Sequence, residues 1–195
     1  EFLFFQKRMN IFSVEATKKT GKENFSYEGK IYDFSLQDFW SWNNSDLLNN
    51  ALRGKLAEYI IMKALDIQQA FRLERDDYDL NYKGLRIEIK SWAYIQSWEQ
   101  RKFSNIIFWI KPTQAEKWGD KKRQSDLYIF CLLKHKQAWS IDPLKLEQRT
   151  FYTLPTSILD EKVEGQKTIT LQSLLKLMPK ENSFVDLKEH LDSFL

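Results

Sequence analysis

Residues 77–90 contain the pattern that most restricts how this chain can fold. Apolar and charged side chains alternate over residues 85–90, and apolar or aromatic side chains alternate with polar ones over residues 77–82. A period of two is typical of strands that have one buried and one open face. Between the two segments, Lys83-Gly84 fits a two-residue turn. The sequence therefore predicts an antiparallel β-hairpin here.

The turn fixes which side chains of this hairpin meet. Leu80 pairs with Ile87, so Asp79 faces Glu88. Side chains opposed in this way have Cβ atoms roughly 4.5–5.5 Å apart, and like charges at that separation are destabilising. A divalent cation such as Mg²⁺ offsets the repulsion, because one or two carboxylates with waters and phosphate oxygens usually hold it. Lys90 points to the same face and can orient or polarise a water on the metal, which is an arrangement for phosphodiester cleavage.

A solvated hairpin without catalysis is the alternative interpretation. In the same register Asp77 faces Lys90, and an opposite-charge pair can simply lie on an open sheet face. An acid two residues before a lysine also recurs elsewhere, for example in Glu28-Gly-Lys30. Only Glu88-Ile-Lys90 lies in an alternating strand opposite a second acid, so we favour the functional interpretation.

Length and composition favour one folded globule. The chain has 195 residues, of which 43% are hydrophobic and 15% aromatic, enough for a core under a sheet. Residues 1–30 are interpreted as the remnant of a protease-site tag and a polar lead, and residues 31–195 as a single nuclease-like domain with its catalytic core at about 45–135. No apolar run reaches the roughly 18 residues of a membrane span, so no membrane association is expected.

Cysteine and histidine usage excludes several kinds of site. Cys131 is the single cysteine and lies in an apolar segment, which excludes an intrachain disulfide and fits a reducing, cytoplasmic setting. His135 and His190 match no zinc spacing. The sequence has neither a Walker loop nor a Gly-x-Gly-x-x-Gly motif, so nothing supports nucleotide-driven chemistry.

The positive charge is concentrated in the middle of the chain. The net charge is +3, yet residues 83–136 hold 12 lysines and arginines against 5 acids. Phosphate backbones attract a basic surface interleaved with tryptophans, although a solvated basic loop is the plainer explanation for any single residue. The candidate nucleic-acid contacts are Gln96, Gln100, Arg101, Lys102, Lys121, Lys122 and Arg123.

The order of predicted elements indicates a mixed sheet flanked by helices, an α/β (α+β) fold. A capping pattern places a helix start at Ser35. The other predicted elements are a helix at residues 45–66 with an apolar stripe at 48, 52, 56, 59, 60 and 64, strands at 71–74, 105–110, 127–133 and 151–155, and helices at 171–177 and 185–195. The runs at 105–110 and 127–133 resemble central strands, and Pro155 indicates an edge strand.

Glu58 has two interpretations of equal weight. It lies beside the apolar stripe of its helix, where an acid is unusual. It can be a surface acid paired with Lys55. It can also be a third carboxylate that the helix delivers to the hairpin, with Gly54 permitting close approach.

The chain resembles the PD-(D/E)XK nuclease superfamily, which has the restriction-endonuclease-like fold. The matching stretch runs from the helix containing Arg53-Gly-Lys-Leu-Ala-Glu58, through Tyr78-Asp79, to Glu88-Ile-Lys90, about a third of the chain. A bacterial branch is most similar, and its signatures here are Phe39-Trp40, Ser45-Asp-Leu-Leu48 and Tyr94-Ile-Gln-Ser-Trp98. Tyr78 replaces the namesake proline, which leaves Asp76 and Asp77 as rivals of Asp79.

The resemblance implies a restriction-endonuclease-like core with a catalytic hairpin. Asp79 and Glu88 would ligate Mg²⁺, for which Mn²⁺ can substitute, together with the Ile89 carbonyl and Glu58. Lys90 would position the attacking water. We expect a homodimeric endonuclease of restriction type that cuts double-stranded DNA, one strand per subunit. A structure-selective DNA repair nuclease and a catalytically inactive nucleic-acid-binding protein of the same fold are the alternatives.

Overall fold

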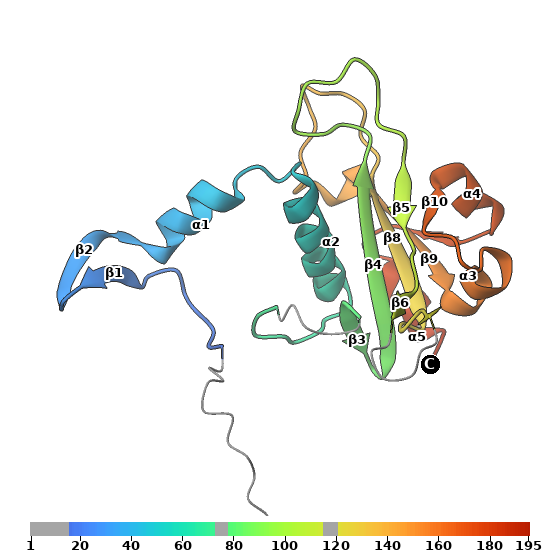
Figure 1. Ribbon diagram of the computed structural model, residues 1–195, viewed down its shortest axis with the longest axis horizontal. Helices are drawn as coiled ribbons and strands as arrows, with labels where there is room; N and C mark the ends of the chain where they lie inside the picture. Colours follow the sequence, from blue (N-terminus) through green and yellow to red (C-terminus); the bar gives the residue numbers. More distant parts are fainter. Residues whose placement is uncertain (1–15, 73–77, 115–120) are drawn as a thin grey trace, which may run out of the picture. The chain divides into compact units, whose positions relative to one another are not determined.

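The computed structural model describes residues 16–72, 78–114 and 121–195 and divides the chain into two compact units (Figure 1). The first unit is Glu1–Trp42, and the second is Asn43–Leu195. At residues 113, 114, 121 and 122 only the backbone is described.

The first unit carries a β-hairpin that leads directly into a helix. Strand β1 (Asn24–Tyr27) pairs antiparallel with β2 (Lys30–Ser35), a hairpin that the sequence pattern did not predict. Helix α1 (Leu36–Asn44) starts with the expected capping box. The Ser35 N–H donates to Asp38 Oδ2 (2.6 Å), and the Asp38 N–H donates to Ser35 Oγ (3.3 Å). The helix start predicted at Ser35 is confirmed.

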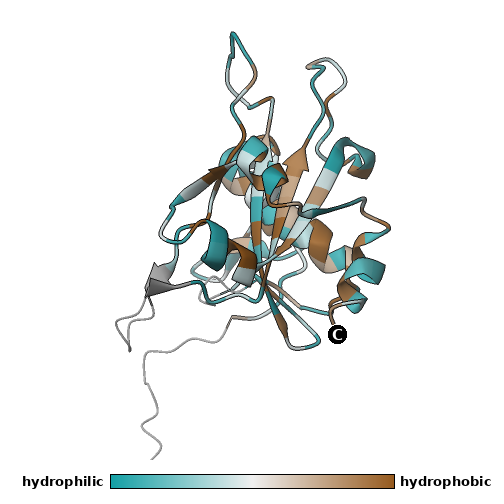
Figure 2. Ribbon diagram, turned by 90° about the vertical axis from the view of Figure 1, so that its right-hand side faces the viewer, coloured by the Kyte–Doolittle hydropathy of each residue, from teal (hydrophilic) through white to brown (hydrophobic). Residues whose placement is uncertain are grey.

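The second unit is built on a mixed five-stranded sheet with the order β11-β9-β8-β4-β3. Its strands are β3 (Leu80–Tyr82), β4 (Leu85–Ala93), β8 (Leu127–Leu133), β9 (Arg149–Pro155) and β11 (Lys180–Asn182). Strands β4 and β8 run parallel, and the other neighbours are antiparallel. Every residue of β8 is buried, and the middle of the sheet is strongly hydrophobic (Figure 2). The predicted mixed α/β class is confirmed.

Helices cover both faces of the sheet (Figure 1). Helices α2 (Asn50–Ala64) and α5 (Leu187–Asp192) share one apolar cluster with the sheet. The opposite face is covered by α3 (Thr156–Lys162), α4 (Leu171–Lys176) and a two-stranded sheet of β5 (Ile107–Trp109) and β10 (Thr168–Thr170). The remaining elements are β6 (Thr113–Gln114), its partner β7 (Lys121–Lys122) and a 3₁₀ turn at Leu146–Gln148. Within the described residues, no helix is long and apolar enough to cross a bilayer.

Three strand predictions need correction. The segment 105–110 forms β5, which pairs with β10 outside the main sheet. Strand β9 lies inside the sheet, because Pro155 ends the strand, where its missing N–H removes no ladder bond. In the predicted strand 71–74, residues 71 and 72 are irregular, and the other two lie outside the described residues.

The buried face of helix α2 matches the predicted stripe only in part: Ile60 is buried and Leu56 and Ala64 pack against the core, but the start of the helix and the centre of its buried face differ from the prediction. The helix begins after Asn49, whose side-chain oxygen accepts the Ala51 N–H (3.0 Å), and not near Ser45. Ala57 and Ile61 are fully buried, whereas Tyr59, a member of the predicted stripe, is 54% exposed. The helix carries apolar residues on several sides, so periodicity alone does not identify its buried face.

Gly54 provides a test of the packing around α2. The expected close approach is absent, because a Cβ at Gly54 would meet nothing within 4 Å. We expect Gly54→Ala to raise the free energy of unfolding by about 0.5–1 kcal/mol, the usual cost of glycine in a helix interior. Urea denaturation measures the change. Gly84→Ala is the contrast and should lose stability, since Gly84 has a φ of +93°.

Candidate active site

The hairpin of β3 and β4 forms in the predicted register. Leu80 pairs with Ile87, and Tyr82 with Leu85. Lys83 and Gly84 have positive φ values of 51° and 93°, as a type I′ turn requires. The Asn81 side-chain oxygen accepts the Gly84 N–H (3.0 Å) and fixes this turn. The turn chemistry thus sets the register of the hairpin as far as the Leu80–Ile87 pair, and Asp79, which was expected to face Glu88, lies just beyond the paired residues.

Asp79 lies immediately before β3 and departs from the regular ladder. Its N–H donates to the Ile87 carbonyl (3.0 Å), although Leu80 is the residue paired with Ile87. Such an offset has the pattern of a β-bulge, which redirects the side chain of the extra residue. Asp79 Oδ2 then accepts the Ile89 N–H (2.6 Å). The Asp79 carboxylate is therefore held against the backbone of β4, the strand that carries Glu88.

The environment of Asp79 favours its protonated form. Burial is the main cause, and the neighbouring Glu88 carboxylate is the second; together they raise the pKa of Asp79 to about 7. Glu58 raises this pKa as well, whereas the Ile89 N–H and Lys90 lower it. In the absence of metal, the Asp79 carboxyl group therefore tends to hold a proton. A cation that binds this group displaces the proton.

Glu88 and Lys90 form an ion pair on the same face of β4. Their side chains are 20% and 26% exposed, so solvent reaches both. The ion pair holds the Lys90 ammonium beside a carboxylate of the candidate site. The structure thus brings Asp79, Glu88 and Lys90 together. Their catalytic roles, and that of the Ile89 carbonyl as a ligand, stay predictions.

Glu58 projects from α2 toward the start of β3. Its carboxylate accepts two hydrogen bonds from the Arg72 guanidinium, at 2.5 Å from Nε and 3.2 Å from Nη2. The Glu58 side chain is only 15% exposed and lines one cavity together with Asp79. Sequence reasoning missed Arg72, because no periodic pattern links it to a helix residue 14 positions earlier.

The acids do not form a ready-made cage. Within residues 16–72, 78–114 and 121–195, no group of three or more His, Cys, Asp or Glu side chains is arranged to hold a metal ion. Asp76 and Asp77, the rival acids, lie outside the described residues. A site built on Asp79 and Glu88 is therefore a two-carboxylate site, with Glu58 nearby but bound to Arg72.

Gln96 and Gln100, which were predicted to contact nucleic acid, instead hold a loop together. Gln96 is only 4% exposed; its side chain accepts from Arg53 Nη1 (2.7 Å) and donates to the Ala93 carbonyl (2.8 Å). Gln100 accepts the Gln96 N–H (2.6 Å) and donates to Ser104 Oγ (2.9 Å). The amide groups of both residues thus form hydrogen bonds within the fold and hold the loop after β4 together. This role takes the place of the predicted contact with bases or phosphates.

Arg123 requires the same correction. Its side chain is 1% exposed and binds Asp160 Oδ1 (2.5 Å) and the Ile110 carbonyl (3.0 Å). A guanidinium buried in this way ties β5 and α3 together and is not presented to a phosphate. Charge counting could not distinguish it from the exposed cations around it.

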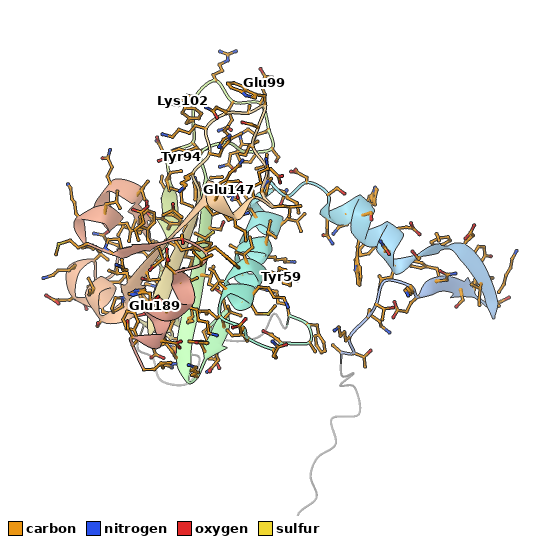
Figure 3. All side chains as sticks on the ribbon, turned by 180° about the vertical axis from the view of Figure 1, so that it is seen from behind. Tyr59, Tyr94, Glu99, Lys102, Glu147 and Glu189 are labelled. Carbon is orange, nitrogen blue, oxygen red and sulfur yellow. The ribbon has the colours of Figure 1, made fainter. Side chains whose placement is uncertain are left out.

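Arg101 and Lys102 are the exposed members of the predicted set. Both belong to the loop after β4, and Lys102 lies near its far end (Figure 3). A second loop contacts this one, since Lys136 Nζ lies 4.2 Å from the Tyr94 ring centroid and 5.7 Å from that of Phe103. Lys121 and Lys122 form β7, and their side chains lie outside the described residues.

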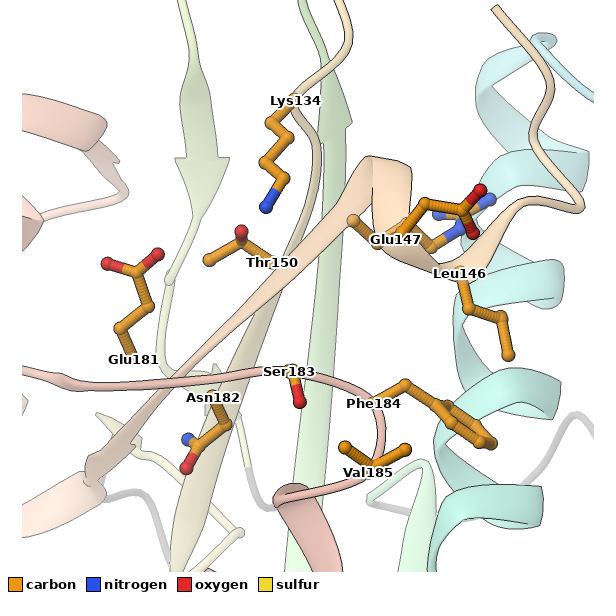
Figure 4. A pocket seen from close by; sticks show the side chains of 10 residues that line it. Lys134, Leu146, Glu147, Thr150, Glu181, Asn182, Ser183, Phe184 and Val185 are labelled. Atoms are coloured by element: carbon orange, nitrogen blue, oxygen red, sulfur yellow. The ribbon is translucent and has the colours of Figure 1, made fainter.

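A cavity of about 510 Å³, larger than the one lined by Glu58 and Asp79, lies along β9 and β11 (Figure 4). Its walls mix charges of both signs, with Lys134 and Arg149 against Glu147 and Glu181. None of the predicted catalytic residues lines it. Volume alone therefore does not locate the chemistry of this protein.

The second unit is thus a mixed sheet whose β3–β4 hairpin brings two acids and a lysine close together. The family model described as bacteriophage T4 endonuclease IV matches residues 6–173. The match covers well over half of the chain, so the chain belongs to the bacteriophage T4 endonuclease IV family. At this level the protein is a DNA endonuclease. No curated protein matches the chain, and neither does any solved structure.

Proposed function

We propose that this chain is a Mg²⁺-dependent DNA endonuclease with a PD-(D/E)XK-type catalytic hairpin. One observation carries the proposal: the buried Asp79 carboxylate is held against β4 by the Ile89 N–H, close to the Glu88 carboxylate, which forms an ion pair with Lys90. Family membership supports the reaction class. The restriction-endonuclease-like core and the restriction type rest on this hairpin and on the resemblance.

The donor set suits a hard cation. Asp79 and Glu88 offer carboxylate oxygens, and Mg²⁺ commonly binds through one or two carboxylates while keeping several waters. Mn²⁺ suits the same oxygen ligands and can substitute. When bound, the metal supplies Lewis-acid stabilisation of the phosphoryl oxygens and a more acidic water.

The chain's own residues then have distinct tasks. Asp79 and Glu88 hold the cation, and the Lys90 ammonium hydrogen-bonds and orients the attacking water. Glu58 positions Arg72 at the edge of the site through its two hydrogen bonds. Lys102 and its exposed neighbour Arg101 contribute phosphate contacts, as do Lys121 and Lys122 in this proposal. The proposed substrate is double-stranded DNA, cut by a homodimer with one strand per subunit.

Metal removal tests this function directly. The purified protein should cut plasmid and linear DNA with Mg²⁺ or Mn²⁺ and lose that activity when EDTA removes the metal, because phosphodiester hydrolysis then lacks its Lewis acid. Sequencing the product ends separates restriction-type cutting from structure-selective cutting. DNA binding without cleavage under every metal tested would instead favour the catalytically inactive alternative.

A further inference from the structure

A cavity of about 290 Å³ opens beside Asp79; Glu88 and Lys90 do not line it. It lies between α2, the irregular segment at residues 69–72 and the start of β3, entirely within the second unit. Glu58 and Asp79 both belong to its wall. Any substrate group that enters this cavity is therefore next to Glu58 and Asp79.

One part of the cavity wall is aromatic and apolar. It consists of Tyr59, Met62 and Phe71. Tyr59 lies on α2 (Figure 3) and is 54% exposed, so part of its ring is available to a ligand. Aromatic side chains stack on nucleobases without requiring a particular sequence. This wall provides the contact that a base needs outside its own stack.

A polar part of the wall carries cations that suit a phosphate. Arg72 lines the cavity, and its two bonds to Glu58 hold its planar fork there. The permanent positive charge of a guanidinium attracts phosphate oxygens. Lys55 belongs to the same wall. Gln69 adds a side-chain amide, which can both donate to and accept from the edge of a base.

The size of the cavity selects among nucleic-acid ligands. Pockets for whole drug-sized ligands occupy about 300–1,000 Å³, so about 290 Å³ accepts one base with its sugar and excludes a stacked dinucleotide. A base reaches such a pocket only after leaving its stack.

We infer that this cavity is a nucleotide subsite. It takes the unstacked base and sugar of the nucleotide next to the scissile phosphate; Phe71 and Tyr59 stack on the base, Gln69 meets its edge and Arg72 holds the phosphate. The inference rests on the proposed nuclease function, and it makes the cut depend on the identity of one flanking base.

Matched substitutions test the subsite through cleavage. Arg72→Ala should raise the KM for DNA by about tenfold, whereas Arg86→Ala should not, because Arg86 pairs with Asp126 away from the cavity. Gln69→Ala should change which bases flank the cut, read by sequencing all product ends. Gln68→Ala is its control, since Gln68 is exposed and does not line the cavity.

The aromatic wall has a test that allows for misfolding. Phe71→Ala should weaken binding of a deoxynucleoside 5′-monophosphate by about tenfold, and Phe71→Tyr should restore it because the ring face is kept. Thermal melting of both variants checks folding. Equilibrium dialysis with the four deoxynucleoside monophosphates measures binding without requiring cleavage.

The outcomes separate this inference from the proposed function. If the wild type cuts DNA while Gln69→Ala and Phe71→Ala leave the flanking bases and the KM unchanged, the subsite is refuted and the nuclease stands. If the wild type never cuts DNA, the nuclease fails, and dialysis alone decides whether the cavity binds nucleotides. Binding that survives in both Arg72→Ala and Phe71→Ala would place it elsewhere and refute the subsite.

Discussion

Lys90→Ala should lower the rate of DNA cleavage by about 10²–10⁴-fold while leaving DNA affinity nearly unchanged. The ammonium pairs with Glu88 on β4, and the Lys90 side chain is 26% exposed, so it can reach and orient a water. One charge among many contributes little to phosphate attraction. Single-turnover cleavage at saturating protein, with a parallel binding assay, measures both quantities.

Lys188→Ala is the matched control for this experiment. Lys188 is also a partly exposed lysine in an ion pair, with Asp66 at 2.5 Å, but it belongs to α5 and not to the hairpin. Its variant should cleave like the wild type. Equal cleavage by the wild type and Lys90→Ala would remove Lys90 from the mechanism.

Charge reversal separates binding from chemistry in the opposite direction. Exposed Lys102 is suited to this test, because Lys102→Glu should weaken DNA binding and its salt dependence without altering the rate of the bound complex. Arg123 is unsuited to it, since a carboxylate placed there would face Asp160 in a buried setting and destabilise the fold.

The hairpin could be predicted because its rules are local. Alternation and the Lys83-Gly84 turn together fix the register, and the observed pairing of Leu80 with Ile87 follows. The offset at Asp79 could not be predicted, since a bulge depends on how the chain before β3 enters the sheet. The sequence thus identifies the two acids but not the bond from Ile89 that orients one of them.

Long-range contacts explain the remaining differences. Arg72 bonds Glu58 within the wall of one cavity, and nothing in the spacing of the two residues reveals this contact. The apolar run of β5 predicts burial but not its partner β10. Gln96 and Arg123 look like surface polar residues in the sequence, yet each provides buried hydrogen bonds within the fold. Composition reports how polar a segment is, and only the tertiary structure shows where its polar groups are used.

Asp79→Asn should remove a pH dependence of the folding stability. In metal-free protein the pKa of Asp79 is about 7, whereas in the unfolded chain it is near 3.9. Between these values the folded state binds more protons, so this group's contribution is complete below about pH 4 and is lost as the pH rises toward 7. The asparagine does not ionise and can still accept the Ile89 N–H. At pH 8 in EDTA, we therefore expect the variant to be more stable than the wild type by about 1–2 kcal/mol.

The same substitution should remove the response to metal. In the wild type, metal binding displaces the Asp79 proton, so Mg²⁺ affinity should rise up to tenfold per pH unit and level off near pH 7. Mg²⁺ at about 100 times its Kd should stabilise the wild type by about 2.7 kcal/mol. Asp79→Asn should lose this stabilisation and at least about 10³-fold of the cleavage rate, because one of two charged ligands is gone. Asp66→Asn, at an exposed carboxylate paired with Lys188, should retain both. Denaturation and cleavage measured with and without Mg²⁺ across this pH range distinguish the two variants, and an unchanged metal response in Asp79→Asn would exclude Asp79 as a ligand.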